Sequence, residues 1–261
     1  MSLRRFQAKG NKQIALYVLL LILVFIMAGL LRNCRGPHTL PPVERGFSEG
    51  DTLDVAVVYG PGSYALSGDT LTGANYRLLT YMRDSLGWPL RLWPVVSAAE
   101  TLPALESGQY DILASLPSDN NLKTRVLTTD EVWLDKLVLV QRPPKGDEKP
   151  VTSALDLAGD TVHVEKGSAA ERRLHNLMRE IGDTIYIAAE ENTGEEYLAM
   201  RTATGQYRYS VINEITARML KNGRYPDLNI ETPVAFTQFQ VWAVRRNDTE
   251  LLKRLNAVIS R

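Results

Sequence analysis

The sequence predicts an α/β fold of two lobes joined by two crossovers and preceded by one transmembrane helix. Three observations predict it: an uncharged run near the N-terminus, short apolar runs alternating with amphipathic segments after residue 51, and a repeat of that alternation after residue 138. The composition, 44% hydrophobic and 23% charged, is typical of a globular core. Thirty basic residues balance thirty acidic ones, so we expect no nucleic-acid partner.

The N-terminal run predicts a membrane anchor. Residues 14–31 carry no charge, and at about 1.5 Å per residue they cross most of a hydrocarbon core of about 30 Å. The basic residues that precede the run, and that hold this end in the cytoplasm, are Arg4, Arg5, Lys9 and Lys12. We therefore expect a cytoplasmic tail (1–13), a single-pass anchor in the cytoplasmic (inner) membrane (14–33), a linker (34–50) and a periplasmic domain (51–261).

Two other interpretations of the N-terminus stay open. A cleavable signal peptide is one, although residues 27–33 lack a small-residue cleavage site. Lipidation of Cys34 is the other, although Arg32 and Asn33 stand where a lipoprotein signal has small residues. Cys34 is the only cysteine, so the exported domain is expected to fold without an internal disulfide.

The first lobe is predicted from alternating strands and helices. Its expected strands are 53–58, 90–96 and 110–116, and its expected helices are 73–87 and 97–108. Ser97 and Glu100 have the spacing of a capping box, which satisfies the free amides of a first helical turn. Short connections between such elements are typical of a parallel sheet covered by helices.

The second lobe repeats this pattern. Its expected strands are 138–141, 161–164, 184–187 and 207–212. Helices between them begin with the capping-box pairs Ser168/Glu171 and Thr193/Glu196.

The C-terminal segment is predicted to return to the first lobe. A strand over 239–245 and an amphipathic helix over 251–258 complete it. Lobe 1 is therefore expected over about 51–138 and 233–261, and lobe 2 over about 139–232, with a cleft between them.

Four segments carry a resemblance to a known family. Residues 71–73, 105–114, 166–171 and 243–248 are similar to the type II periplasmic (extracellular) solute-binding proteins of family 3. Within that family, the chain most resembles the N-terminal domain of the membrane-bound lytic transglycosylases F, from residue 53 to about 258. The resemblance implies a ligand site in the cleft, no catalytic residues in this chain and no cofactor.

The resemblance also implies that the site lacks the two charged residues with which the family binds an amino acid. The family's arginine after the third strand, which clamps a ligand carboxylate, corresponds here to Leu122. Arg125, one helical turn along, either replaces it or is a solvated surface cation. The family's aspartate for the ligand amine corresponds to Asn213, followed by Glu214. Both departures argue against a free α-amino acid as ligand.

Other positions suit a ligand in the cleft. Tyr64 and Trp133 match family aromatics that contact ligands, and ordinary core packing is the alternative. Gly167 and Ser168 offer helix N-terminal amides to an anion, and simple capping is the alternative. The candidate ligand-binding residues are Tyr64, Asn75, Ser115, Pro117, Asp119, Arg125, Trp133, Gly167, Ser168, Asn213 and Glu214.

The sequence shows no pattern for enzymatic or metal chemistry. The three histidines lack metal-ligand spacing, and neither a nucleophile elbow nor a phosphate-binding glycine loop occurs. Glu106-Ser107 is similar to a transglycosylase glutamate-serine pair, but it lies in the binding domain, so we interpret it as coincidence. The acidic cluster over 190–196 is interpreted as complementing a helix dipole.

These observations predict a non-enzymatic, membrane-anchored domain that binds or senses a small ligand, such as a cell-wall-derived peptide (muropeptide) or sugar, by closing its lobes. The membrane, through residues 14–31, and a membrane or cell-wall protein are the other expected partners. Two alternatives stay open: the regulatory N-terminal part of a peptidoglycan lytic transglycosylase, and the substrate-binding subunit of an ABC-type importer.

Overall fold

The computed structural model describes residues 17–21, 23, 27 and 50–260. Residues 17–21 are helical, and most of the predicted anchor, 14–33, lies outside the described residues. Within the described part of the chain, no helix is long and apolar enough to cross a membrane. Residues 42–261 form one compact unit, which contains both predicted sheets.

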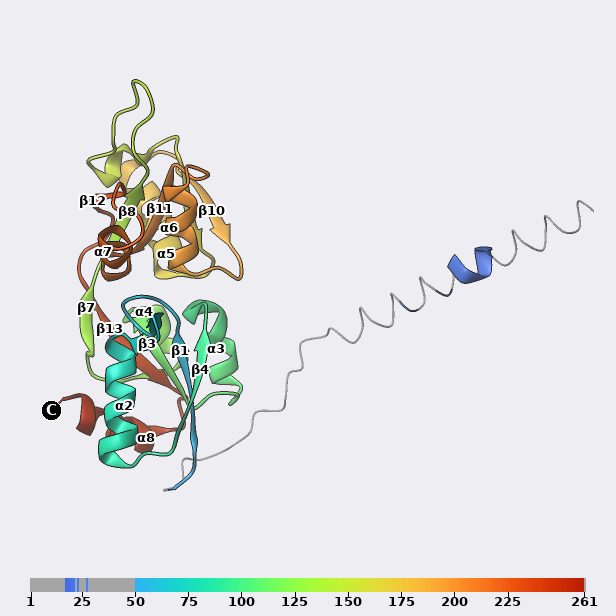
Figure 1. Cartoon of the computed structure of the whole chain (residues 1–261), viewed down its shortest axis with the longest axis vertical. Coiled ribbons are helices and arrows are strands. Elements are labelled where there is room, and N and C mark those ends of the chain that lie inside the picture. The colour runs from blue at the N-terminus through green and yellow to red at the C-terminus, as the bar shows by residue number, and fades with distance from the viewer. Residues whose placement is uncertain (1–16, 22, 24–26, 28–49, 261) are drawn as a thin grey trace, which may run out of the picture. The chain divides into compact units, whose positions relative to one another are not determined.

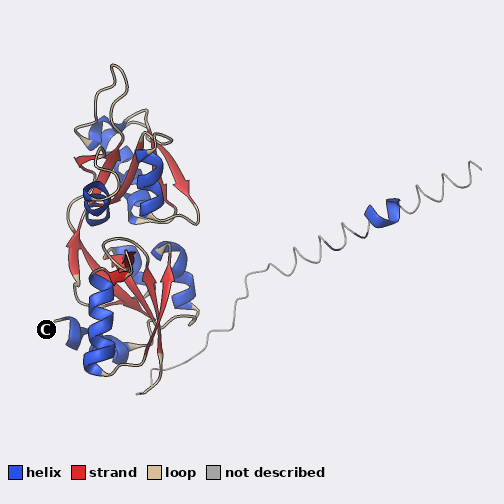
Figure 2. Cartoon of the chain, in the orientation of Figure 1, coloured by secondary structure: helices blue, strands red, loops and turns tan. Residues whose placement is uncertain are grey.

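Lobe 1 is built on a mixed sheet with the strand order β4-β1-β5-β13-β6, and β7 also pairs with β13 (Figures 1 and 2). Its strands are β1 (Leu53–Val58), β4 (Leu90–Val95), β5 (Ile112–Pro117), β6 (Leu127–Thr128), β7 (Trp133–Asp135) and β13 (Gln238–Val244). Its helices are α2 (Ala74–Leu86), α3 (Ala98–Glu106), α4 (Asn120–Arg125) and α8 (Thr249–Ile259), and a hairpin joins β2 (Ala65–Ser67) to β3 (Thr70–Thr72).

Alternation along the strands buries both faces of this sheet. Val55 and Val57 of β1 pack with residues of α2 and α8, whereas Ala56 packs on the other face with residues of α3. Strand β1 is parallel to β4 and β5, as the alternating pattern predicts. Strand β13 is antiparallel to β5 because the chain returns from lobe 2 in the opposite direction.

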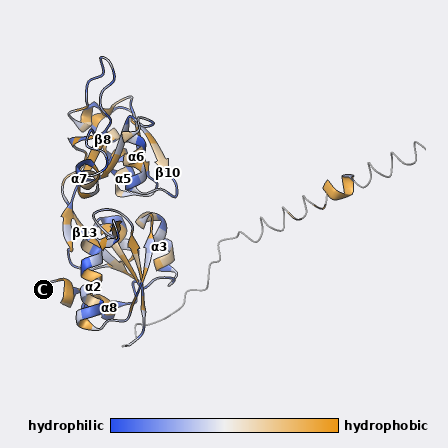
Figure 3. Ribbon diagram, in the orientation of Figure 1, coloured by the Kyte–Doolittle hydropathy of each residue, from blue (hydrophilic) through white to orange (hydrophobic). Residues whose placement is uncertain are grey.

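Lobe 2 has the strand order β10-β9-β11-β8-β12. Its strands are β8 (Leu137–Gln141), β9 (Thr161–Glu165), β10 (Tyr186–Glu190), β11 (Tyr209–Asn213) and β12 (Asn229–Pro233). Helix α5 (Ala169–Ile181) and the short η1 (Ala154–Leu157) pack on one face, and α6 (Glu195–Ala203) and α7 (Glu214–Asn222) pack on the other. The loop after β8, over 142–150, is hydrophilic (Figure 3).

Two crossovers join the lobes, from β7 to β8 and from β12 to β13 (Figure 1). The predicted two-lobed α/β fold is therefore confirmed for the described residues. The serine half of two predicted capping boxes is confirmed, because the hydroxyls of Ser97 and Ser168 accept hydrogen bonds from the third amide of their helices. The carboxylates of Glu100 and Glu171 accept the amides of Asn192 and Gly167 instead of closing the boxes. The prediction for Thr193 is wrong: α6 begins after Gly194 without a side-chain cap, and the Thr193 hydroxyl donates to the Glu190 carbonyl instead.

Candidate functional site

A cavity of about 150 Å³ lies between the lobes. It forms where the parallel strands end, because their carboxyl ends meet at the same edge of each sheet. Lobe 1 contributes the residues after β1, β4 and β5, and lobe 2 contributes those after β9 and β11. Both crossovers reach it, through Asp135 and Gln240. The cavity therefore lies at the position that lobe closure would enclose.

The lobe 1 wall contains a kink at Ser115. Its φ is 76°, a region that non-glycine residues rarely adopt, and the pairing of β5 with β13 shifts register at this point. Such local strain persists where the surrounding structure holds it, and it is common at binding sites. The bulge places Ser115 and Pro117 in the cavity wall.

The lobe 2 wall is formed by the turn from β9 into α5. Gly167, with φ +71°, makes this turn, and Ser168 caps the helix by accepting the Glu171 amide at 3.2 Å. The Gly167 amide donates to the Glu171 carboxylate at 2.6 Å, and the Ser168 amide donates to the Glu165 carbonyl. Ser168 therefore caps the helix, and the amides of Gly167 and Ser168 are already bonded within the turn.

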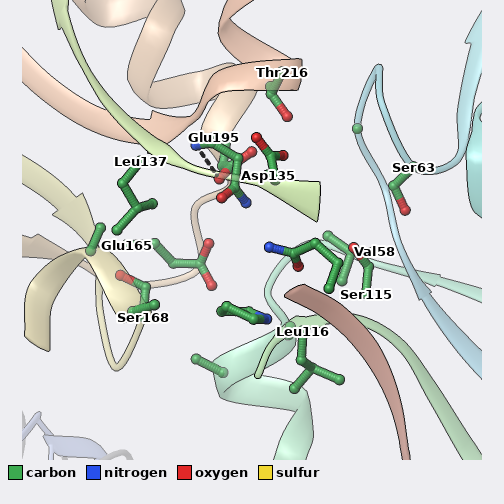
Figure 4. A pocket seen from close by; sticks show the side chains of 18 of the residues that line it. Val58, Ser63, Ser115, Leu116, Asp135, Leu137, Glu165, Ser168, Glu195 and Thr216 are labelled. Carbon is green, nitrogen blue, oxygen red and sulfur yellow. Dashed lines mark hydrogen bonds between the residues drawn. The ribbon is translucent and has the colours of Figure 1, made fainter. Parts of the chain in front are cut away.

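Three carboxylates face the cavity, from Asp135, Glu165 and Glu195 (Figure 4). Burial, together with the nearby charges of Glu195 and Glu100, raises the pKa of Glu165 to about 8. Burial raises the pKa of Glu195 to about 7, although its carboxylate accepts the Asn213 amide at 2.9 Å. Burial also raises the pKa of Asp135.

Both arginines in the cavity wall are already paired. Arg125 forms a two-pronged bond with Glu106, at 2.8 and 2.6 Å. Arg172 of α5 pairs with Asp119, the N-cap of α4, at 2.5 Å. A carboxylate clamp needs two parallel N–H groups of one guanidinium, and in both arginines these groups are already engaged. Arg125 therefore lies at the cavity without replacing the missing clamp in this form.

Several bonds cross between the lobes. The Ser97 hydroxyl of lobe 1 donates to the Glu165 carboxylate of lobe 2. Besides the Asp119–Arg172 ion pair, the Asn192 amide donates to Glu100 at 2.9 Å. These bonds need the lobes to be in contact, so the structure is a closed form.

Most of the predicted site residues line the cavity. Those that do are Ser115, Pro117, Asp119, Arg125, Trp133, Gly167, Ser168 and Asn213. Tyr64 instead packs edge-on against Tyr76, and Asn75 is buried between Ser63 and the Trp242 indole. Glu214 pairs with Lys136 and Arg218. These three predicted residues do not line the cavity, and each has a structural partner.

The residues that sequence analysis missed are the carboxylates. Glu165 is the last residue of a parallel strand, which is a position where ligands bind in α/β sheets. That signal could have identified it. Glu195 was interpreted as dipole compensation only, and it does lie in the first turn of α6. Within the described residues, no group of three or more His, Cys, Asp or Glu side chains is arranged to hold a metal ion.

Two lobes, two crossovers and an enclosed cavity define the fold of a solute-binding protein. Solved structures share it. An arginine-binding protein (ArgBP) mutant from T. maritima is 22% identical with a TM-score of 0.66, covering 80% of this chain and 88% of that one. An ancestral arginine-binding protein bound to arginine is 20% identical with a TM-score of 0.68, covering 80% and 91%.

The family model for bacterial extracellular solute-binding proteins, family 3, matches residues 53–261, and the chain belongs to this family. Curated relatives are membrane-bound lytic murein transglycosylases F. The protein from Desulfosudis oleivorans is 28% identical over 74% of this chain and 42% of its own length. That from Alteromonas mediterranea is 24% identical over 93% and 52%. The chain spans about half the length of these relatives or less, and residues 53–261 are a solute-binding domain, not a catalytic one.

Proposed function

We propose that this chain is a membrane-anchored, periplasmic domain that binds a small ligand between its lobes and signals by closing on it. The observation that carries the proposal is the cavity, whose wall is contributed by both lobes. A ligand held there favours the closed form over the open one, because only the closed form completes its contacts.

Specific bonds between the lobes stabilise the closed form. The Ser97–Glu165 and Asp119–Arg172 pairs form only when the lobes meet. At Gly62 of lobe 1, an added Cβ would lie 2.6 Å from the Ile215 Cγ2 of lobe 2, so the glycine permits this approach. The crossovers between β7 and β8 and between β12 and β13 are the hinges of the motion.

Cell-wall-derived peptides or sugars are the ligands we favour. The relatives are named as murein transglycosylases, which supports a ligand from the cell wall. Trp133 lies in the cavity wall, and an aromatic side chain there suits a sugar or peptide surface. Leu122 lies in that wall where a carboxylate clamp would stand, which disfavours a free α-amino acid.

Residues 14–31 anchor the domain, with the N-terminus in the cytoplasm. A membrane or cell-wall protein receives the closure signal. In one alternative, the domain is the regulatory part of a lytic transglycosylase. This alternative is supported by the length of the relatives, which extend well beyond the region that this chain matches. Similarity to the substrate-binding protein of an amino acid ABC transporter supports the importer-subunit alternative.

A thermal-shift screen of the full chain in detergent tests ligand binding. Muropeptides, cell-wall sugars, amines and amino acids are added, and a ligand of the folded state raises the melting temperature. Trp133→Leu should abolish the shift, whereas Tyr186→Leu, at a residue of β10 that is 59% exposed and does not line the cavity, should leave it unchanged. If no compound in any class shifts the melting temperature, the proposal fails.

The anchor is tested separately by cell fractionation. We expect the chain to stay in the membrane pellet after an alkaline carbonate wash, and its domain to be digested by protease added to spheroplasts. Release into the periplasmic fraction would contradict the anchor while leaving ligand binding intact.

A further inference from the structure

Three acidic side chains of the cavity wall have no cation beside them among the described residues. Asp135, Glu165 and Glu195 accept hydrogen bonds from backbone amides and hydroxyls, and within the described part of the chain none of them forms an ion pair. All three residues line the cavity between the lobes (Figure 4). The wall therefore holds three acidic groups without a cation.

Asp135 is a deeply buried carboxylate that bonds backbone amides and, in the part of the chain that the structure describes, no cation. It is only 7% exposed, and its side chain accepts the Lys136 amide at 2.8 Å and the Ile215 amide at 3.2 Å. The Lys136 ammonium turns away to Glu214, at 3.3 Å. A carboxylate this deeply buried is normally paired with a cation, because burying an isolated charge is costly.

The other charged groups of the wall are already neutralised in pairs. Arg125 is bonded to Glu106, and Arg172 to Asp119. Glu196 lies within 3.4 Å of the Arg224 guanidinium. Among the described residues of the wall, both arginines are paired, so no unpaired cation faces an anionic group of a ligand.

We propose that the cavity binds its ligand through an ammonium or guanidinium group placed among Asp135, Glu165 and Glu195, and that the ligand needs no free carboxylate. The inference deepens the proposed function, on which it rests, by naming the ligand class: amines and guanidines, including amino groups of peptides. A cation so placed donates charge-assisted hydrogen bonds to Asp135, at the end of β7 in lobe 1, and to Glu165 and Glu195 of lobe 2.

Matched pairs of compounds test this inference on the full chain in detergent. Agmatine, cadaverine and L-lysinamide carry the cation without a carboxylate, and L-arginine and L-lysine add one. We expect the three amines to raise the melting temperature and to bind at least about tenfold more tightly than the two amino acids in titration calorimetry.

Variants of the wall locate the binding. Asp135→Asn, Glu165→Gln and Glu195→Gln should each weaken amine binding about tenfold or more, since each removes one charged partner. Glu250→Gln, at a side chain that is 65% exposed on α8, is the matched control and should bind as the original chain does. Urea unfolding of each variant confirms that it is folded.

The outcomes separate the two proposals. Binding of neutral sugars or acetylated muropeptides, with no response to amines, would overturn the cation site and leave the solute-binding function standing. Equal or tighter binding of L-arginine than of agmatine would also overturn it. If no compound binds at all, both proposals fall together.

Discussion

Replacing Glu165 by Gln should stabilise the unliganded protein at alkaline pH. The pKa of Glu165 is raised by burial from 4.5 to about 8. Above about pH 4.5 the unfolded chain releases this proton, whereas the folded chain keeps it until about pH 8. The folded state therefore binds more protons across this window, and its stability falls as the pH rises. Gln carries no charge at any pH, so the variant should not lose stability in this way as the pH rises.

The magnitude follows from the displacement of the pKa. Each tenfold change in an equilibrium is worth about 1.4 kcal/mol, so the change from 4.5 to about 8 sets an upper bound of roughly 5 kcal/mol. Glu165 is partly exposed, and solvent screening reduces this bound. We expect the variant to gain about 1–3 kcal/mol at pH 8 relative to its difference from the original chain at pH 4.5.

Urea unfolding of the full chain, followed by tryptophan fluorescence at pH 4.5, 6 and 8, measures this difference. Glu250→Gln makes the same chemical change on the exposed surface of α8, and its stability difference should be constant across the series. A Glu165→Gln difference that is flat with pH, or that shrinks toward pH 8, would refute the reasoning.

Three further substitutions probe packing, closure and capping. Asn75→Ala removes the buried acceptor of the Trp242 indole, at 2.7 Å, and should lower the free energy of unfolding by about 1–3 kcal/mol in urea; an unchanged value would contradict the buried bond. Gly62→Ala adds a Cβ only 2.6 Å from Ile215 Cγ2 across the lobes, so it should weaken ligand binding and enlarge the radius of gyration in solution scattering without lowering the melting temperature. Ser168→Ala should cost about 0.5–2 kcal/mol in urea and Ser168→Asn should restore it, unless the α5 cap is dispensable.

The fold was predictable where local patterns are long. The strand over Leu53–Val58 is a continuous apolar run ended by turn residues, and its observed bounds match the prediction. The hairpin of β2 and β3 was missed because its strands have three residues each, too few to show a period. Strand β6, with two residues, pairs with β13 only through tertiary contact. Such elements depend on neighbours that sequence periodicity does not encode.

The site was predictable only where the family resemblance marks positions. It named Ser115, within β5, and Asn213, at the end of β11, and both line the cavity. The same method excluded a carboxylate clamp but could not find what replaces it. Asp135 ends β7 of lobe 1 and Glu165 ends β9 of lobe 2, so only tertiary folding brings them to one cavity. From sequence alone, an isolated acidic residue at a strand end is interpreted as a solvated surface residue, because most charged residues are exposed.

Glu165 connects the charge of the ligand to the closing motion. In the closed form its carboxylate accepts the Ser97 hydroxyl across the lobes, and the same closure brings it near Glu100 of lobe 1, while Glu195 of its own lobe is already close. Closing without a counter-charge therefore requires Glu165 to hold a proton or to bear the repulsion, which its raised pKa reflects. A cationic ligand removes that requirement and so favours the closed form, whereas a neutral ligand of the same size does not. Amine binding should accordingly release protons at pH 7, measurable as a dependence of the calorimetric enthalpy on the buffer, and Glu165→Gln should reduce that release.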